Sequence, residues 1–272
     1  MNSFQGKTVI ITGASAGVGA ATARAFAKQQ AKLVLIARGQ QALEKIAAEL
    51  KRKTSVMTFA IDVTDTNKYI EMLKAVEQSF GAIHILVNNA GYHKRGDVEK
   101  NTAVDLAKMV DVNLRAPIEL STLTLPYIKK QQDGAIVNVG SLAGRTPLQG
   151  AATYSATKAG LRAFTYALAE ELQDTSINVG VVSPGPIDTG FIMSELDDVE
   201  DIVFSQPMSS AEQVAHAIMQ IADGQSTEIS LPKASGWLTT LSYLFPKLRQ
   251  ILRPVLYRKG KAAKEKYRNK MS

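Results

Sequence analysis

The sequence predicts an α/β protein in which helices cover both faces of a doubly wound, parallel sheet. Three observations lead to this fold class. Short apolar runs alternate along the chain with stretches of helical periodicity. The apolar runs do not alternate with polar residues, as strands with one exposed face would. The connections between them are short, which is typical of successive β-α units.

Six apolar runs are expected to form the strands of this sheet. They span residues 8–11, 32–37, 56–61, 83–87, 135–139 and 177–182. Helices are expected between them, over residues 18–29, 40–51, 66–80, 102–130 and 154–173. A further strand-like run, 227–231, closes the pattern.

The chain shows no internal repeat and no Pro/Gly/Ser-rich linker, so one catalytic domain is expected over residues 1–232. A C-terminal amphipathic, basic helical extension is expected over residues 233–272. Residues 185–209 are the least regular stretch of the domain and predict a mobile loop. This loop would lie at the carboxyl edge of the sheet, where open α/β sheets bind ligands.

Composition excludes several kinds of site. The chain has no cysteine, which excludes disulfides, thiolate metal sites and a cysteine nucleophile. Its three histidines, His84, His93 and His216, are scattered, so no metal site is expected. No segment reaches the roughly 18 apolar residues of a membrane span, and the N-terminus lacks the apolar stretch of a signal peptide. A cytoplasmic location is therefore expected.

The net charge of +7 belongs to the end of the chain. Residues 233–272 contain eleven Lys or Arg and one acidic residue, Glu265, so they carry +10 and the rest of the chain carries −3. A mildly acidic body gives no electrostatic signal for nucleic-acid binding, and none is expected.

A glycine cluster follows the first predicted strand and opens the first predicted helix. Residues 12–19 read Thr-Gly-Ala-Ser-Ala-Gly-Val-Gly. Glycines let a backbone turn tightly and approach a pyrophosphate, while a helix N-terminus directs unpaired N–H groups at an anion. In the first β-α unit of a doubly wound sheet, this cluster predicts a dinucleotide site.

Two further motifs complete a recognisable set. Asn88-Asn89-Ala90-Gly91 follows the fourth predicted strand, and Tyr154 and Lys158 form a Y-x-x-x-K motif at the start of a later helix. With these motifs in this order, the sequence resembles a classical short-chain dehydrogenase/reductase from about Lys7 to Ala222. The resemblance implies a single Rossmann-like domain, a nicotinamide cofactor, and assembly into a homo-oligomer, either a dimer or a tetramer.

The resemblance also implies which residues contact the cofactor. Asp62 would hold the adenine amino group, and residues 184–189 would orient the nicotinamide carboxamide. The implied set is Gly13, Ser15, Gly17, Val18, Gly19, Asp62, Val63, Asn89, Ala90, Gly91, Tyr154, Lys158, Pro184, Gly185, Ile187 and Thr189.

The end of the second predicted strand favours NADP(H) over NAD(H). An acidic residue there would hold the adenosine 2′-hydroxyl and repel a 2′-phosphate. This sequence has Ala37 instead, followed by Arg38, whose guanidinium can pair with a phosphate through two N–H groups. Ala16 stands where many NADP-preferring relatives carry a second basic residue.

The spacing of Tyr154 and Lys158 places both on one face of a helix, a turn apart. A free phenol has a pKa near 10 and is a poor proton donor at neutral pH. A cation about 4 Å away, at an effective dielectric constant of about 20, would stabilise the phenolate by about 4 kcal/mol. That is a drop of about 3 pK units, which would bring the tyrosine to a pKa of about 7, so Tyr154 is the expected general acid and base.

Two more catalytic residues follow from the resemblance. Ser141, after the fifth predicted strand, corresponds to the family's serine that polarises the substrate carbonyl. Asn113 corresponds to the family's helix asparagine that links the lysine to solvent through water. The expected reaction is hydride transfer between NADP(H) and a small-molecule ketone or alcohol, with Tyr154 moving the proton.

Two alternatives stay open. The chain could be a non-catalytic NADP-binding scaffold or sensor, against which the complete set of Ser141, Tyr154 and Lys158 argues. It could also be a membrane-associated reductase of acyl or sterol-like lipid ketones, because the expected pocket residues are largely apolar. Those residues are Leu142, Ala143, Gln149, Phe191 and Met193.

The extension has the pattern of an interfacial helix. A basic run, 258–270, follows apolar residues that recur at three-and-four spacing, although Pro246 and Pro254 should kink or break the helix. An apolar face with flanking cations predicts peripheral contact of residues 237–270 with an anionic membrane. Packing of the same face on the domain or on a second subunit is the alternative. The apolar residues are Trp237, Leu238, Leu241, Leu244, Phe245, Leu248, Ile251, Leu252, Val255 and Leu256.

Overall fold

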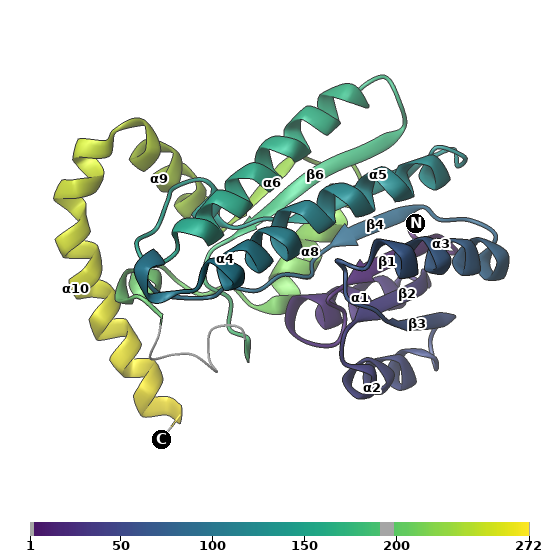
Figure 1. Cartoon of the computed structure of the whole chain (residues 1–272), viewed down its shortest axis with the longest axis horizontal. Coiled ribbons are helices and arrows are strands. Elements are labelled where there is room, and N and C mark those ends of the chain that lie inside the picture. The colour runs from purple at the N-terminus through teal and green to yellow at the C-terminus, as the bar shows by residue number, and fades with distance from the viewer. Residues whose placement is uncertain (1–2, 191–198, 272) are drawn as a thin grey trace.

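The computed structural model describes residues 3–190 and 199–271. Seven parallel strands form one sheet in the order β3-β2-β1-β4-β5-β6-β7, with helices on both faces (Figure 1). The predicted doubly wound, Rossmann-like sheet is thereby confirmed. The strands are β1 (Thr8–Thr12), β2 (Lys32–Ala37), β3 (Val56–Ala60), β4 (Ile85–Asn88), β5 (Gly134–Val139), β6 (Ile177–Pro184) and β7 (Glu228–Leu231).

The helices follow the strands in the expected alternation. The longer ones are α1 (Gly17–Lys28), α2 (Gln40–Leu50), α3 (Thr66–Phe80), α4 (Ala103–Val110), α5 (Ala116–Ile128), α6 (Ala152–Glu171), α8 (Ala211–Ala222), α9 (Lys233–Leu244) and α10 (Pro246–Met271). Short helical turns are η1 (Val98–Lys100), η2 (Asp111–Arg115), η3 (Leu142–Gly144) and η5 (Asp201–Ser205).

Each face of the sheet has its own apolar core. Phe26 of α1 and Ile218 of α8 belong to one core, together with Ile11 of β1. Tyr69 of α3 belongs to the other core, together with Ile10 of β1. Because neighbouring residues of β1 point into different cores, both must be apolar, which explains why the predicted strands show no polar alternation.

The strand order creates a switch point between β1 and β4. The chain adds β2 and β3 on one side of β1 and then crosses back to place β4 on the other side. The loops that leave β1 and β4 therefore diverge, and the crevice between them is where open sheets bind ligands. The glycine cluster, residues 12–19, and the segment 88–91 both lie at this crevice.

The helix predicted over residues 102–130 is interrupted. A π-helical turn, η2, separates α4 from α5. Pro117 in the first turn of α5 has no N–H, and in a regular α-helix its ring would clash with the carbonyl of Asn113. The extra residue of a π turn takes that carbonyl out of register and relieves the clash.

The irregular segment 185–209 is held together where the structure describes it. Ser209 donates its backbone N–H to the Pro186 carbonyl at 2.9 Å, and Asp188 donates to the Ser209 carbonyl at 3.0 Å. Residues 191–198 lie outside the described residues. The two described ends of the predicted mobile loop are therefore fixed to each other.

Pro246 and Pro254 act differently in the extension. α9 ends at Leu244 and α10 begins at Pro246, so the expected break occurs there. α10 continues through Pro254, because a proline removes one backbone hydrogen bond without forcing the helix to end. In the described ranges, no helix combines the length and the apolar composition needed to cross a bilayer.

The C-terminal half of α10 packs on the domain, beside η5 (Figure 1). Ala263 and Tyr267 contact the small apolar core of Val199 and Phe204. Lys264 is buried beside them, and its ammonium donates to the Val199 carbonyl at 2.6 Å. This half of the extension therefore packs on the domain, but through residues outside the apolar face that the packing alternative concerned.

The predicted apolar face of the extension is exposed. The residues that pack on the domain are a different set from the one that the periodicity identified. The side chain of Leu248 lies outside those described. The exposed members are Trp237, Leu238, Leu241, Leu244, Phe245, Ile251, Leu252, Val255 and Leu256.

Candidate active and cofactor site

The glycine cluster is shaped so that a phosphate can approach its backbone. Gly13 and Gly17 adopt positive φ angles of 67° and 51°, which side chains disfavour. A Cβ atom at Gly19 would collide with the Gly13 carbonyl, so this turn of α1 packs tightly on the loop. Ala16 at the N-cap has no side-chain oxygen to occupy the first N–H groups of α1. The residues present therefore fit a bound pyrophosphate.

Hydrogen bonds tie this loop to the end of β4. The Thr12 hydroxyl accepts from the backbone N–H groups of Asn89, at 3.0 Å, and Ala90, at 2.9 Å. The Asn89 side-chain amide donates back to the Thr12 carbonyl at 2.8 Å. The structure therefore brings together the two predicted cofactor segments, which the sequence separates by about seventy residues.

The predicted adenine end lies at the carboxyl edge of β2 and β3. Arg38 is exposed directly after β2, and Asp62 follows β3. Partial burial raises the pKa of the Asp62 carboxyl, but hydrogen bonds from Thr64 and the charges of Arg38 and Lys108 lower it below its usual value. Asp62 is thus an anion whose acceptor oxygens are already oriented.

The predicted nicotinamide segment lies over the glycine cluster. Gly185, just after β6, donates its N–H to the Leu231 carbonyl at 2.7 Å. The methyl group of Thr189 lies 3.6 Å from where a Cβ atom of Gly17 would stand. Residues 184–189 therefore reach from the end of β6 back to the phosphate loop.

Ser141 and Tyr154 meet at the carboxyl end of β5. Ser141 follows β5 in an extended conformation, and its hydroxyl accepts from the Ala143 N–H at 3.1 Å. Tyr154 lies in the first turn of α6. Burial raises the pKa of the Tyr154 phenol, and a hydrogen bond with the Ser141 side chain offsets part of this rise. The net pKa lies above its ordinary value of 10.

Lys158 does not bring the pKa of Tyr154 down to about 7, as the spacing of the two residues predicted. The Lys158 ammonium donates to the Val139 carbonyl at 2.8 Å and lies 5.9 Å from the centre of the Tyr154 ring. Burial lowers the pKa of Lys158 itself to about 8. The prediction of a tyrosine pKa near 7 was wrong for this arrangement, because it assumed a cation at about 4 Å and ignored the desolvation of the phenol.

Asn113 lies in the π turn and is fully buried. Its amide pairs with the backbone of Tyr92: the carbonyl oxygen accepts from the Tyr92 N–H at 3.0 Å, and the amide nitrogen donates to the Tyr92 carbonyl at 2.8 Å. A Cβ atom at Gly91 would stand 3.1 Å from the Asn113 oxygen and 3.6 Å from the Lys158 ammonium. Asn113 thus fixes the segment that follows β4 beside Lys158. The water-mediated link between Asn113 and Lys158 stays a prediction.

His93 is a site residue that the sequence analysis did not identify. Its ring stacks on the Tyr154 ring, with centroids 4.3 Å apart and planes inclined by 19°. Burial and, secondarily, the charge of Arg95 lower its pKa to about 3. Its place two residues after the Asn89-Ala90-Gly91 motif was the available signal.

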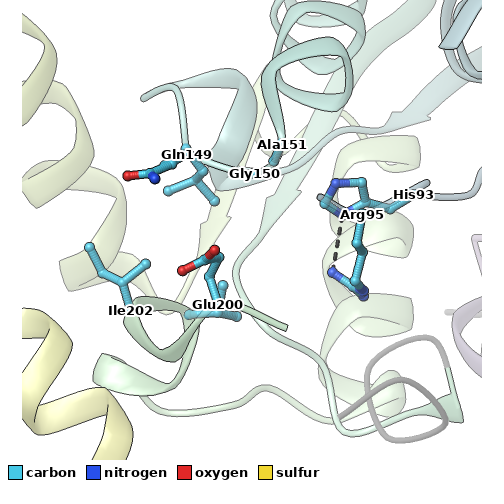
Figure 2. Close-up of a pocket in the computed structure, with 9 residues that line it drawn as sticks. His93, Arg95, Gln149, Gly150, Ala151, Glu200 and Ile202 are labelled. Atoms are coloured by element: carbon cyan, nitrogen blue, oxygen red, sulfur yellow. Dashed lines mark hydrogen bonds between the residues drawn. The ribbon is translucent and has the colours of Figure 1, made fainter. Parts of the chain in front are cut away.

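A pocket opens beside this pair (Figure 2). Among the expected pocket residues, Gln149 lines it, Leu142 and Ala143 are buried elsewhere in η3, and Phe191 and Met193 lie outside the described residues. Most of the lining is apolar, as predicted, and charged residues from two loops also reach it. Its lining consists of His93, Arg95, Leu148, Gln149, Gly150, Ala151, Glu200, Ile202 and Val203.

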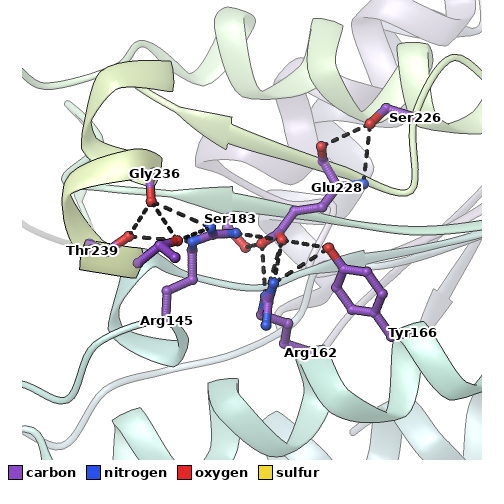
Figure 3. A network of polar contacts seen from close by, with 9 residues as sticks. Arg145, Arg162, Tyr166, Ser183, Ser226, Glu228, Gly236 and Thr239 are labelled. Atoms are coloured by element: carbon purple, nitrogen blue, oxygen red, sulfur yellow. Dashed lines mark hydrogen bonds and ion pairs between the residues drawn. The ribbon is translucent and has the colours of Figure 1, made fainter. Parts of the chain in front are cut away.

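A buried polar network joins the loop after Ser141 to the extension (Figure 3). The Glu228 carboxylate pairs with Arg145 at 2.5 Å and with Arg162 at 2.8 Å. Burial alone would raise the Glu228 pKa, but hydrogen bonds from Arg162, Arg145, Ser183 and Tyr166 lower it to about 2. Arg145 also donates to α9, to the hydroxyl of Thr240 at 2.7 Å.

Comparison with known proteins identifies relatives along most of the chain. Residues 7–200 match the family description of short chain dehydrogenases. An uncharacterized oxidoreductase of Staphylococcus epidermidis is 35% identical over 83% of this chain and 96% of its own length. A ketoacyl reductase of Nostoc sp. is 33% identical over 84% of this chain and 79% of its own.

Two further comparisons concern the cofactor. An NADP-dependent 3-hydroxy acid dehydrogenase of Schizosaccharomyces pombe is 37% identical over 70% of this chain and 75% of its own length. The crystal structure of a short chain dehydrogenase/reductase from Burkholderia phymatum in complex with NAD superimposes with a TM-score of 0.81, covering 92% of this chain and 97% of that one. At 24% identity, this structure supports the fold alone.

Proposed function

The chain belongs to the short-chain dehydrogenase family and is an oxidoreductase, and from that premise we propose its reaction. It transfers a hydride between NADP(H) and a carbonyl or alcohol substrate, with Tyr154 as the general acid and base. The observation that carries this proposal is that Ser141, directly after β5, and Tyr154, in the first turn of α6, lie close enough for the Ser141 side chain to affect the pKa of the phenol, next to the buried Lys158 at the carboxyl edge of the sheet.

Each residue of this group has a task that its surroundings support. The Tyr154 phenol holds the proton that passes to the carbonyl oxygen in reduction and returns in oxidation. The Ser141 hydroxyl stabilises the charge that develops on that oxygen. Lys158, with a pKa of about 8, is cationic at neutral pH and favours the phenolate that proton transfer leaves behind. When bound, the nicotinamide supplies or accepts the hydride.

NADP(H) is the proposed cofactor. Arg38 stands exposed at the end of β2, where its guanidinium is available to a 2′-phosphate, and Ala37 before it carries no charge that would repel one. The name of the fission-yeast relative, an NADP-dependent dehydrogenase, agrees with this reading. We also propose that the residues from Gly13 to Thr189 named in the sequence analysis contact this cofactor. The support is that the glycine cluster, residues 12–19, fits a bound pyrophosphate.

The substrate class we favour is a 3-oxoacyl or 3-hydroxyacyl compound. The names of two relatives refer to compounds of this kind: one is a ketoacyl reductase and the other a 3-hydroxy acid dehydrogenase. The polar side chains in the pocket, such as Gln149 and Glu200, suit an oxygenated substrate better than a wholly apolar one. A sterol-like ketone is the competing substrate class.

A substrate panel tests the proposal. The purified protein is incubated with NADPH and either simple ketones, 3-oxoacyl thioesters or oxosteroids, and oxidation of NADPH is followed. We expect turnover, with the highest kcat/KM for the 3-oxoacyl compounds. Tight NADPH binding without turnover of any member would instead favour the scaffold or sensor.

The extension gives the protein a second surface, which we propose contacts an anionic membrane from the cytoplasmic side. Trp237 and Ile251 belong to the exposed apolar face of the extension, and they are 76% and 71% exposed. Basic residues surround this face, and each Lys or Arg near an anionic surface contributes about 1 kcal/mol to binding. The competing occupant is a second copy of the chain in the homo-oligomer that the family resemblance implies.

Co-sedimentation with vesicles distinguishes these occupants. The wild type should bind anionic vesicles at low salt, and Trp237→Glu combined with Ile251→Glu should abolish binding, because charge opposes insertion of the face. Val104→Glu, at a residue that is 77% exposed on α4, is the matched control and should bind normally. Two results together would assign the face to a second copy of the chain: the wild type does not bind anionic vesicles, and the wild type forms an oligomer that the double variant does not form.

A further inference from the structure

The imidazole of His93 is held firmly above the catalytic tyrosine. Its ring stacks on Tyr154 at 4.3 Å between centroids. The residue before it, Tyr92, is fixed through both its backbone N–H and its carbonyl by the buried amide of Asn113. The same turn that places Asn113 beside Lys158 therefore also fixes where His93 stands relative to the phenol.

The contact with Arg95 decides which ring nitrogen of His93 carries the hydrogen. An Arg95 guanidinium nitrogen lies 3.1 Å from Nδ1 of His93 (Figure 2). A guanidinium can only donate, so Nδ1 accepts and the hydrogen must be on Nε2. With a pKa of about 3, the ring stays neutral over the whole working range of the enzyme, and Nε2 stays a donor.

This Nε2 donor is enclosed and has no acceptor among the residues that the structure describes. Native structures pair nearly all buried donors, because an unpaired one loses its hydrogen bond to water without replacement. His93 also lines the pocket beside Tyr154, together with Arg95 and Gln149. An enclosed donor that lacks a protein partner, on a residue that lines a pocket, is placed to bind a ligand atom once a ligand occupies the site.

We propose that His93 is a substrate-binding residue whose Nε2–H donates to a second oxygen of the substrate, the acyl oxygen two carbons from the reacting carbonyl. This inference rests on the proposed carbonyl reduction and names the feature that selects among carbonyl substrates. The rings are stacked with their centroids 4.3 Å apart, so the imidazole N–H and the phenol hydroxyl belong to the same part of the site. Tyr154 then donates a proton to the reacting oxygen while the His93 N–H binds the acyl oxygen. A simple ketone has no second oxygen to accept a hydrogen bond from His93.

Two variants separate the hydrogen bond from the stacking. His93→Phe keeps an aromatic ring over Tyr154 and removes the donor. His93→Gln removes the ring and can place an amide N–H near the position of Nε2. For each protein, kcat/KM is measured with a 3-oxoacyl thioester, with the free 3-oxo acid, and with an alkyl ketone of equal length. NADPH affinity is measured in parallel to verify that each variant is folded.

The expected result is a change in discrimination. His93→Phe should lower the ratio of kcat/KM for the 3-oxoacyl compounds over the ketone by about tenfold to a hundredfold, with the ketone itself little affected. His93→Gln should retain most of the wild-type ratio. The thioester and the free acid both carry the acyl oxygen. Whichever of these two compounds loses more kcat/KM in His93→Phe is the form of the substrate that His93 binds.

Three results would overturn the inference. A wild type without preference for the 3-oxoacyl compounds would refute the role of His93 while leaving carbonyl reduction intact. Equal losses for all substrates in His93→Phe would assign His93 to packing on Tyr154. Wild-type protein that binds NADPH and reduces no carbonyl would refute the proposed function itself, and with it the inference.

Discussion

Arg38 offers the most direct residue-scale test of cofactor choice, because it is exposed and its replacement leaves packing unchanged. Arg38→Asp should lower kcat/KM with NADPH about tenfold to a hundredfold, since it exchanges a charge-assisted hydrogen bond for repulsion of the 2′-phosphate. The efficiency with NADH should rise or stay level. Arg52→Asp, at another exposed arginine just after α2, is the control. Equal losses with both cofactors would contradict the assignment.

Lys158 predicts the alkaline limb of the pH profile. Its pKa is lowered to about 8, so it loses its positive charge as the pH rises through that value. Without the cation the phenolate is no longer favoured, and kcat/KM for carbonyl reduction should therefore fall above pH 8. The raised pKa of Tyr154 excludes the phenol as the cause of a limb at that pH. A profile that stays flat until pH 10 would show that Lys158 is not the titrating group.

At this scale, the sequence could predict residues whose chemistry depends on spacing alone. Gly13 and Tyr154 stand in motifs whose spacing is itself the signal. Protonation could not be predicted in the same way, because the pKa values of Tyr154 and Lys158 depend on burial and on the Val139 carbonyl. His93 was missed because its place just after the Asn89-Ala90-Gly91 motif indicates only that it lies near the site, and not that it stacks on a ring about sixty residues away.

α10 is the element whose role differs most from its sequence pattern. Its contacts with η5 support the segment from which Glu200, Ile202 and Val203 line the pocket. The Tyr257 hydroxyl of α10 also donates to the Glu200 carboxylate at 3.1 Å. This helix therefore supports one side of the pocket from behind and also carries part of the exposed apolar face.

Gly260→Val tests that role. A Cβ atom at Gly260 would collide with the Asp201 carbonyl, so a side chain there must push α10 away from η5. We expect KM for the carbonyl substrate to rise several-fold or more, while the affinity for NADPH is unchanged because the glycine cluster lies elsewhere. Ala262→Val, on the exposed side of α10, is the matched control. Unchanged KM in Gly260→Val would mean that α10 does not support the pocket.

Helix and strand periodicity predicted the elements well where packing on the sheet dictates them. The π turn at 111–115 could not be predicted, because it depends on how Pro117 fits the preceding turn rather than on an apolar pattern. The residues through which α10 packs were not identified, because small residues and a buried lysine make much of the contact, and periodicity gives weight only to large apolar side chains.

The Glu228 network affects the whole molecule, since it links α6, β6, β7, α9 and the loop after Ser141. The Glu228 pKa is lowered from 4.5 to about 2, so its ionised form stabilises the folded state above pH 4.5, and this contribution is lost as the pH falls towards 2. The shift corresponds to about 3 kcal/mol of the free energy of unfolding.

Glu228→Gln should therefore destabilise the protein by about 3–5 kcal/mol at neutral pH, because it leaves Arg145 and Arg162 without their buried counter-ion. The difference in unfolding free energy between wild type and variant should shrink as the pH falls from 4.5 towards 2, because Glu228 takes up its proton in the unfolded chain first. Denaturant unfolding at several pH values measures this. A difference that does not change with pH would contradict the pairing.

Replacement of one hydroxyl tests the central claim, that Tyr154 transfers a proton in NADPH-dependent carbonyl reduction. Tyr154→Phe keeps the ring that stacks on His93, so folding and NADPH affinity should be retained. Oxidation of NADPH with the best 3-oxoacyl substrate should fall by about a hundredfold to ten-thousandfold, the usual contribution of general acid-base catalysis. A variant that binds NADPH normally and keeps more than about a tenth of the wild-type rate would contradict the account.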